Sequence, residues 1–247
     1  RLRQPGSAFK PFVYTDAFKK GYTDKTIVVD EPINYAGYSP KNYDGMYRGA
    51  ITLRSALAQS LNVPAVKVLA EMTSVEDSIK TASDFGITTL TKPASFYGLP
   101  LVLGGGEVTL LEMTSAYGVF ASNGYANTPV SILKIVDSNG KIVEEKNSSP
   151  KRVLDSNIAK MINDILSDND ARSPMFGYNS TINIPGISVK TGTTQNYKDG
   201  WTIGYNNSIV IGVWAGNNDN TPMINAPGIS VAAPAWRELF EYYLSKV

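Results

Sequence analysis

ISVKTGTTQNYKDGWTIGY, residues 187–205, is the stretch of the sequence that decides the fold. Two runs rich in β-branched and aromatic residues, 187–193 and 201–205, lie on either side of a short polar connection in it. A third such run follows at 208–215, after the turn residues Asn206-Asn207. Short runs of this kind joined by tight turns predict an antiparallel sheet.

The chain ahead of this sheet is mostly helical in pattern. Capping-box patterns at Thr73–Glu76 and Thr109–Glu112 mark the starts of two helices. Gly104-Gly105-Gly106 lacks the ending of a phosphate-binding loop and is interpreted as a turn. Apolar residues at helical spacing predict helices from Ser7 to about 21, 52–59, 64–73, 74–85, 110–122, 155–167 and from Pro234 onward.

The remaining segments are a loop and a hairpin. Residues 23–50 lack steady periodicity and predict a long irregular connection, whereas 130–136 and 141–145 flank a turn and predict a β-hairpin. The fold class is therefore α+β: an antiparallel sheet flanked by helices, plus a helix-rich lobe. We expect the lobe at about 22–180 and the sheet with its C-terminal helix at about 181–247.

The composition excludes several classes of function. The chain has 247 residues and a net charge of +1 from 23 basic and 22 acidic residues, so it lacks the charge of a nucleic-acid binder. It contains no histidine and no cysteine. Their absence removes thiol nucleophiles, the Ser-His-Asp triad and nearly all zinc sites, and we expect no metal and no cofactor. A serine enzyme of this composition would use Lys, Glu, Asp or Tyr as its base.

Three short motifs carry candidate chemistry. Ser7 and Lys10 are three residues apart on one helix face, where a neutral amine can take the serine proton. Ser60-Leu61-Asn62 interrupts two helices, and the sequence Lys-Thr-Gly-Thr at 190–193 lies on the first predicted strand. Each motif alone is common in helix caps, turns and strand ends. Together, in this order, they form the signature set of serine β-lactamases and penicillin-binding proteins.

Longer stretches around these motifs carry a family resemblance. Residues 3–12 (RQPGSAFKPF), 53–65 (LRSALAQSLNVPA), 107–124 (EVTLLEMTSAYGVFASNG) and 190–205 resemble the transpeptidase domain of the bifunctional, class A penicillin-binding proteins. The resemblance covers nearly the whole chain and implies one transpeptidase domain over 1–247. In this family two strands and a helix precede the Ser-x-x-Lys helix, so it also implies missing N-terminal strands, and with them a missing glycosyltransferase domain and membrane anchor.

The resemblance implies a role for each motif residue. Ser7 would be the nucleophile, Lys10 its base, and Ser60 the relay that carries a proton to the leaving amine. Asn62 would bind the substrate amide and orient Lys10. The backbone N–H groups of Ser7 and Thr193 would form the oxyanion hole. Lys190 would be the cation that lowers the pKa of Lys10. The residues of the strand that bind the substrate would be Thr191, Gly192, Thr193 and Thr194.

The implied reaction is peptidoglycan cross-linking at the extracytoplasmic face of a bacterial membrane. The partners would be stem peptides, a D-Ala-D-Ala donor and an amine acceptor, with β-lactams as covalent inhibitors. A β-lactamase of the same superfamily is one alternative. It would need a glutamate to activate water, and the candidates Glu107 and Glu112 lie in a capping pattern instead. A non-catalytic β-lactam sensor is the other alternative.

Overall fold

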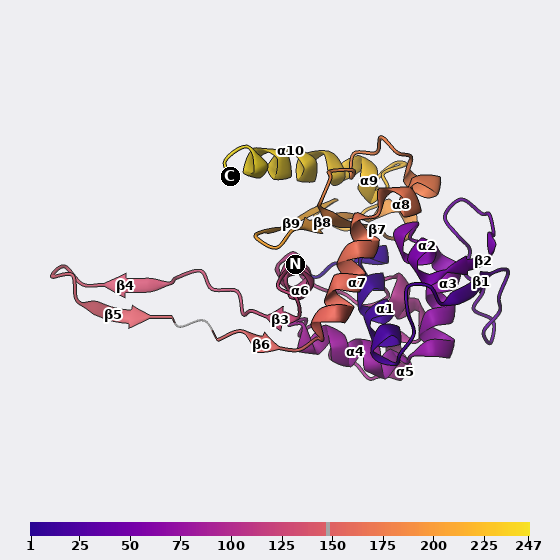
Figure 1. The fold of residues 1–247 in the computed structure, drawn as a ribbon, viewed down its shortest axis with the longest axis horizontal. Helices are drawn as coiled ribbons and strands as arrows, with labels where there is room; N and C mark the ends of the chain where they lie inside the picture. Colours follow the sequence, from indigo (N-terminus) through magenta and orange to yellow (C-terminus); the bar gives the residue numbers. More distant parts are fainter. Residues whose placement is uncertain (147–148) are drawn as a thin grey trace.

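The computed structural model describes residues 1–146 and 149–247 (Figure 1). Its sheet has three antiparallel strands in the order β7 (Ser188–Thr193), β8 (Asp199–Tyr205) and β9 (Val210–Gly216). All seven residues of β8 are buried, because helices cover both faces of the sheet. The predicted α+β sheet is therefore confirmed, with each strand within two residues of its predicted bounds.

Helices of different chain regions cover the two faces of the sheet (Figure 1). On one face, α9 (Gly228–Val231) and α10 (Ala233–Leu244) contact β8 and β9, and Trp236 packs with Val189 of β7 in one apolar cluster. On the other face, α6 (Leu110–Ala121) contacts β8 and β9, and α7 (Ser156–Ser167) contacts β7. The sheet thus lies between two layers of helices.

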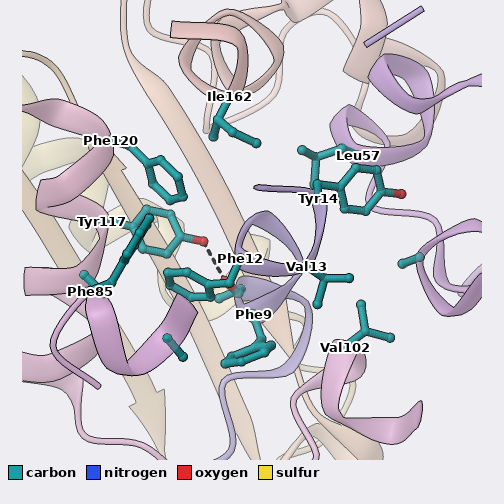
Figure 2. Packing of buried hydrophobic residues seen from close by; sticks show 14 of the residues in the cluster. Phe9, Phe12, Val13, Tyr14, Leu57, Phe85, Val102, Tyr117, Phe120 and Ile162 are labelled. Carbon is teal, nitrogen blue, oxygen red and sulfur yellow. Dashed lines mark hydrogen bonds between the residues drawn. The ribbon is translucent and has the colours of Figure 1, made fainter. Parts of the chain in front are cut away.

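The helix-rich side is built around one buried helix, α1 (Lys10–Lys19). All its residues from Lys10 to Phe18 are buried, as expected for a helix packed on every side. The ring of Phe12 lies 5.8 Å from Phe85, 5.8 Å from Tyr117 and 6.0 Å from Phe120, between centroids (Figure 2). The helices packed around α1 are α2 (Leu53–Ala58), α3 (Asn62–Lys67), α4 (Val75–Asp84) and α7.

Two predictions about short segments are wrong. Residues 23–50 are not wholly irregular, because β1 (Ile27–Asp30) pairs antiparallel with β2 (Gly49–Thr52) across them. The four-residue run IVVD was too short to stand out by alternation. The capping box predicted at Thr73–Glu76 does not form: the helix cap is Ser74, one residue later, whose hydroxyl accepts from the Asp77 N–H without a reciprocal side-chain bond. The box at Thr109–Glu112 is confirmed in full.

The predicted hairpin forms an arm that projects from the body (Figure 1). It consists of β4 (Lys134–Val136) and β5 (Ile142–Glu145), as expected from the turn between them. Prediction missed several short elements. These are α5 (Ala94–Tyr97), η3 (Leu99–Leu103), β3 (Tyr125–Ala126), β6 (Lys151–Arg152), α8 (Asn169–Phe176) and η4 (Gln195–Tyr197). The helix predicted at 64–73 is confirmed, and its second part is a π-helical turn, η2 (Val68–Met72).

Neither a membrane-spanning helix nor a metal-binding cluster occurs in the part of the chain that the structure describes. Its helices fall short of the length and apolar character that a bilayer crossing requires. Its acidic side chains nowhere gather in groups of three or more that could hold a metal ion.

Candidate active site

Ser7 lies in a 3₁₀ turn, η1 (Gly6–Phe9), that leads directly into α1 and lies against β7. The predicted helix therefore begins with a tighter turn at the serine. The carbonyl of Gln4 accepts from Trp201 Nε1 at 2.8 Å. On the other side the Ala8 carbonyl accepts from the buried Tyr117 hydroxyl at 2.7 Å, the dashed line in Figure 2. The backbone is thus fixed on both sides of Ser7.

Two glycines allow this turn to touch the strand. Gly6 has φ +56°, and a Cβ there would lie 2.5 Å from the Thr193 carbonyl oxygen. Gly104 has φ +85°, and its Cβ would lie 2.1 Å from the Gly6 nitrogen. The Gly6 backbone therefore contacts the backbones of Gly104 and Thr193, which is possible because neither Gly6 nor Gly104 carries a Cβ. The sequence interpretation of Gly104 as a simple turn missed this contact.

Lys10 is fully buried and is held by the loop between α2 and α3 and by the first residue of α3, Asn62. Its Nζ donates to the Ser60 carbonyl at 2.5 Å and to Asn62 Oδ1 at 2.8 Å, and lies 3.4 Å from Ser60 Oγ. Ser7 lies one helical turn away on the same segment. Within the described residues, the Ser7 hydroxyl makes no hydrogen bond, so it is available to a ligand.

Lys190 reaches the same loop from β7. Its Nζ donates to Ser60 Oγ at 2.7 Å and to the Thr191 carbonyl at 2.9 Å. The Ser60 hydroxyl therefore lies between the two amines. Ser60 has φ +59°, a left-handed conformation that is uncommon for a residue with a Cβ and that is typical of functional sites. The structure thus brings together Lys10, Ser60, Asn62 and Lys190, as predicted.

Burial lowers the pKa of both amines. The pKa of Lys10 is lowered well below its usual value by desolvation and, to a smaller extent, by the charge of Lys190. Desolvation lowers the pKa of Lys190 to about 7. A neutral amine beside a hydroxyl can accept its proton, whereas an ordinary lysine at neutral pH cannot. The site therefore holds two buried amines whose lowered pKa values make them better proton acceptors than ordinary lysines.

The two lysines also predict how stability depends on pH. Between pH 7 and about 10, the unfolded chain binds more protons at these lysines than the folded protein does, so stability rises with pH. We expect the free energy of unfolding, measured by urea denaturation, to rise over this window by up to about 1.4 kcal/mol per pH unit for each lysine. Above it the trend should reverse, because burial raises the pKa of Tyr14, Tyr117 and Tyr205. A flat or falling curve between pH 7 and 10 would contradict the buried-amine geometry.

Thr193 and Thr194, at the end of β7, differ in their hydrogen-bond partners. Thr194 N donates to the Asp199 carbonyl at 3.1 Å, so the preceding N–H, that of Thr193, faces the opposite edge, where η1 lies. The Thr193 hydroxyl accepts from Gly228 N at 2.9 Å. The Thr194 hydroxyl is engaged with Asp199, donating to its carboxylate at 3.1 Å and accepting from its N–H at 2.9 Å. Both hydroxyls therefore have protein partners in this structure.

The comparison with known families rests on the whole chain. The family model for the penicillin binding protein transpeptidase domain matches residues 2–241. The chain belongs to this family. Penicillin-binding protein 1A of Neisseria flavescens is 34% identical over 260 residues, which cover 98% of this chain and 32% of that protein. Penicillin-binding protein 1A of Aquifex aeolicus is 35% identical over 246 residues, covering 95% of this chain and 32% of that protein. The predicted resemblance to class A penicillin-binding proteins is confirmed.

Solved structures agree in fold. Penicillin-binding protein 1A of Haemophilus influenzae superposes with a TM-score of 0.85 at 26% identity, over 99% of this chain and 42% of that chain. The penicillin-binding protein PonA1 of Mycobacterium tuberculosis superposes with a TM-score of 0.88 at 22% identity, over 100% of this chain and 70% of that chain. The chain spans only about a third of the length of the curated relatives that it matches, which is 32% of each.

Proposed function

We propose that this domain is a serine D,D-transpeptidase that cross-links peptidoglycan stem peptides through an acyl-enzyme on Ser7. The observation that carries the proposal is the buried Lys10 amine, one helical turn from Ser7 and hydrogen-bonded to Asn62 Oδ1. An amine with a lowered pKa in this position can take the Ser7 proton as the hydroxyl oxygen attacks. Family membership supports the same reading.

The proposed reaction has two halves. In the first, Ser7 Oγ bonds to the carbonyl carbon of the penultimate D-Ala, and its proton passes to Lys10. The peptide C–N bond then breaks, and a proton carried through the Ser60 hydroxyl neutralises the departing amine of the terminal D-Ala. In the second, an acceptor amine attacks the ester, its proton returns to Ser7, and the cross-link is released. Water in place of the amine gives carboxypeptidase activity.

Backbone and cationic groups around Ser7 are proposed to bind the substrate. The N–H of Thr193 faces η1, and together with the N–H of Ser7 it would stabilise the oxyanion of the tetrahedral intermediate. The terminal carboxylate would lie near Lys190, where its negative charge favours the protonated amine. We propose that Thr191, Gly192, Thr193 and Thr194 make the other contacts between the substrate and β7. Because the Thr194 hydroxyl is already hydrogen-bonded to Asp199, the backbone of Thr194 is the better candidate for contact with the substrate.

We also propose a setting for the whole protein. The relatives are about three times as long as this chain, which supports further segments such as a glycosyltransferase domain and a membrane anchor. The domain would then span 1–247, with lobes at about 22–180 and 181–247, and work at the extracytoplasmic face of a bacterial membrane. Its partners would be stem peptides, and β-lactams would acylate it.

The β-lactamase alternative receives less support from the carboxylates. The Glu112 carboxylate accepts from the Thr88 N–H at 2.9 Å and from the Thr109 N–H at 3.1 Å. These bonds make it a structural cap, and hydrogen bonds from these threonines keep its pKa low despite partial burial. A carboxylate held in this way is a poor base for activating water. The sensor alternative is distinguished only by a cross-linking assay.

The test is the intact mass of the folded domain after incubation with benzylpenicillin. We expect one adduct, mapped by peptide digestion to Ser7 and persisting over hours, because no activated water attacks the ester. The same preparation should join a D-Ala-D-Ala donor peptide to an amine acceptor. No adduct on protein shown to be folded by circular dichroism would refute the Ser7 mechanism. Rapid loss of the adduct would favour a β-lactamase, and a stable adduct without cross-linking a sensor.

A further inference from the structure

Asn42 is a buried residue in the connection between β1 and β2, where the other residues at 31–48 are exposed or half-buried. Only 3% of its surface is exposed, whereas its neighbours Lys41 and Tyr43 are exposed. Its Oδ1 accepts from the backbone N–H of Asn62 at 2.9 Å and of Val63 at 3.1 Å. A buried amide with two partners on one oxygen is fixed in place.

These two N–H groups belong to the first turn of α3. The residue at the N-cap of that helix, Leu61, has no side chain that could accept a hydrogen bond. Such N–H groups normally find a Ser, Thr, Asp or Asn at the cap position itself. Asn42 therefore supplies from another segment the cap that α3 lacks, and in doing so it fixes the backbone of Asn62.

The other end of the Asn42 side chain is fixed by Asp30, the last residue of β1. Asn42 Nδ2 lies 2.9 Å from each carboxylate oxygen of Asp30 and 2.8 Å from the Met46 carbonyl. Asp30 is 1% exposed and accepts a further bond from Arg48 N at 3.0 Å. Because an ionised carboxylate only accepts, the amide nitrogen must face Asp30 and the oxygen must face α3.

The side chain of Asn62 is tied to the same segment and to the base. Its Nδ2 donates to the Lys41 carbonyl at 2.9 Å, and its Oδ1 accepts from Lys10 Nζ at 2.8 Å. A continuous path of hydrogen bonds thus leads from Asp30 through Asn42 and Asn62 to the Lys10 amine.

We propose that Asn42, oriented by Asp30, is a positioning residue for acyl transfer: it holds Asn62 where Asn62 fixes the Lys10 amine. This proposal rests on the proposed function, because it takes Lys10 as the base. Without the Asn42 acceptor, the two N–H groups at the start of α3 lose their partner and the helix start shifts to find another. A displacement of about 1 Å at a catalytic group can reduce a rate by about 10²-fold.

The test uses isosteric exchange. N42D keeps the size of the side chain but sets one carboxylate against another. We expect the first-order rate constant of acylation by benzylpenicillin to fall about 10- to 100-fold, with the dissociation constant of the initial complex changed less than about threefold. In D30N/N42D the new amide at position 30 donates to the new carboxylate at position 42, so part of the rate constant should return; the Met46 carbonyl, which loses its donor, limits the recovery. N34A, an amide change in an exposed part of the same connection, is the matched control and should leave acylation unchanged.

Each outcome bears on one proposal. If the wild-type protein takes no adduct, the proposed function fails. If the wild type is acylated and N42D has the same rate constant, Asn42 is not a positioning residue. If N42D does not fold, D30N decides. Its effect on the acylation rate constant should disappear in an N62A background, whereas independent, additive effects would overturn the path through Asn62.

Discussion

Lys10→Met is expected to slow acylation of Ser7 by about 10²- to 10⁴-fold and, at the same time, to raise the melting temperature of the protein. Loss of a general base reduces a rate by about 10²- to 10⁴-fold, and within the described site no second neutral amine is placed one turn from Ser7. The gain in stability has a separate cause. At neutral pH the lowered pKa makes folding less favourable, because the folded protein binds the proton of this buried lysine more weakly than the unfolded chain does. Methionine has a similar length and carries no titratable group, so its burial does not reduce the free energy of unfolding in this way.

Two measurements check this pair of effects. Stopped-flow acylation with a fluorescent penicillin gives the rate, and calorimetry gives the melting temperature, which shifts about 2–4 °C per kcal/mol in a protein of this size. Lys20→Met is the matched control, since Lys20 follows α1 and pairs with Asp77 at the surface. It should change neither value much. A Lys10→Met protein that melts at a lower temperature would show that the bonds to Ser60 and Asn62 outweigh the cost of burial.

The elements that the sequence predicted best are those determined by residue types and spacing within the segment itself. The strands at 187–193, 201–205 and 208–215 were predictable because β-branched and aromatic residues fill them and turn residues separate them. The Ser7 to Lys10 spacing predicted a shared helix face, and the capping box at Thr109 predicted the start of α6. The grouping of Lys10, Ser60, Asn62 and Lys190 came from the family signature, since nothing local shows that these residues meet.

The parts that prediction missed depend on contacts between distant segments. Asn42 lies in a stretch with no periodicity, and only the fold shows that its amide caps α3 and not its own turn. Asp30 is the last residue of β1, a strand too short to be recognised in the sequence, so the sequence could not predict that Asp30 is buried. The same holds for the glycine contact: the sequence shows a glycine run before a helix, but not that Gly6 lies against it.

Gly104→Ala is expected to destabilise the protein and to slow acylation, although Gly104 contacts no substrate in the proposed mechanism. The left-handed conformation of Gly104 costs about 1–3 kcal/mol for a residue with a Cβ. The collision of that Cβ with the Gly6 nitrogen adds about 1–3 kcal/mol of overpacking. Relief of the collision moves Gly6, and with it the Ser7 N–H. Thermal melting and the acylation rate constant, measured on the folded fraction, report the two effects.

Gly86→Ala separates conformational strain from collision. Gly86 also has a left-handed backbone, φ +97°, but a Cβ there would have nothing within 4 Å. Gly86→Ala should therefore lower the melting temperature through backbone strain alone and leave the acylation rate unchanged. Gly104→Ala should fall below it in melting temperature and lose up to about 10²-fold in acylation rate, because the shift is passed to the nucleophile. Equal acylation rates in the two variants would mean that the loop at 104 yields without moving Gly6. The placement of Ser7 would then depend on the contacts of η1 with β7 and on the hydrogen bonds from Trp201 and Tyr117.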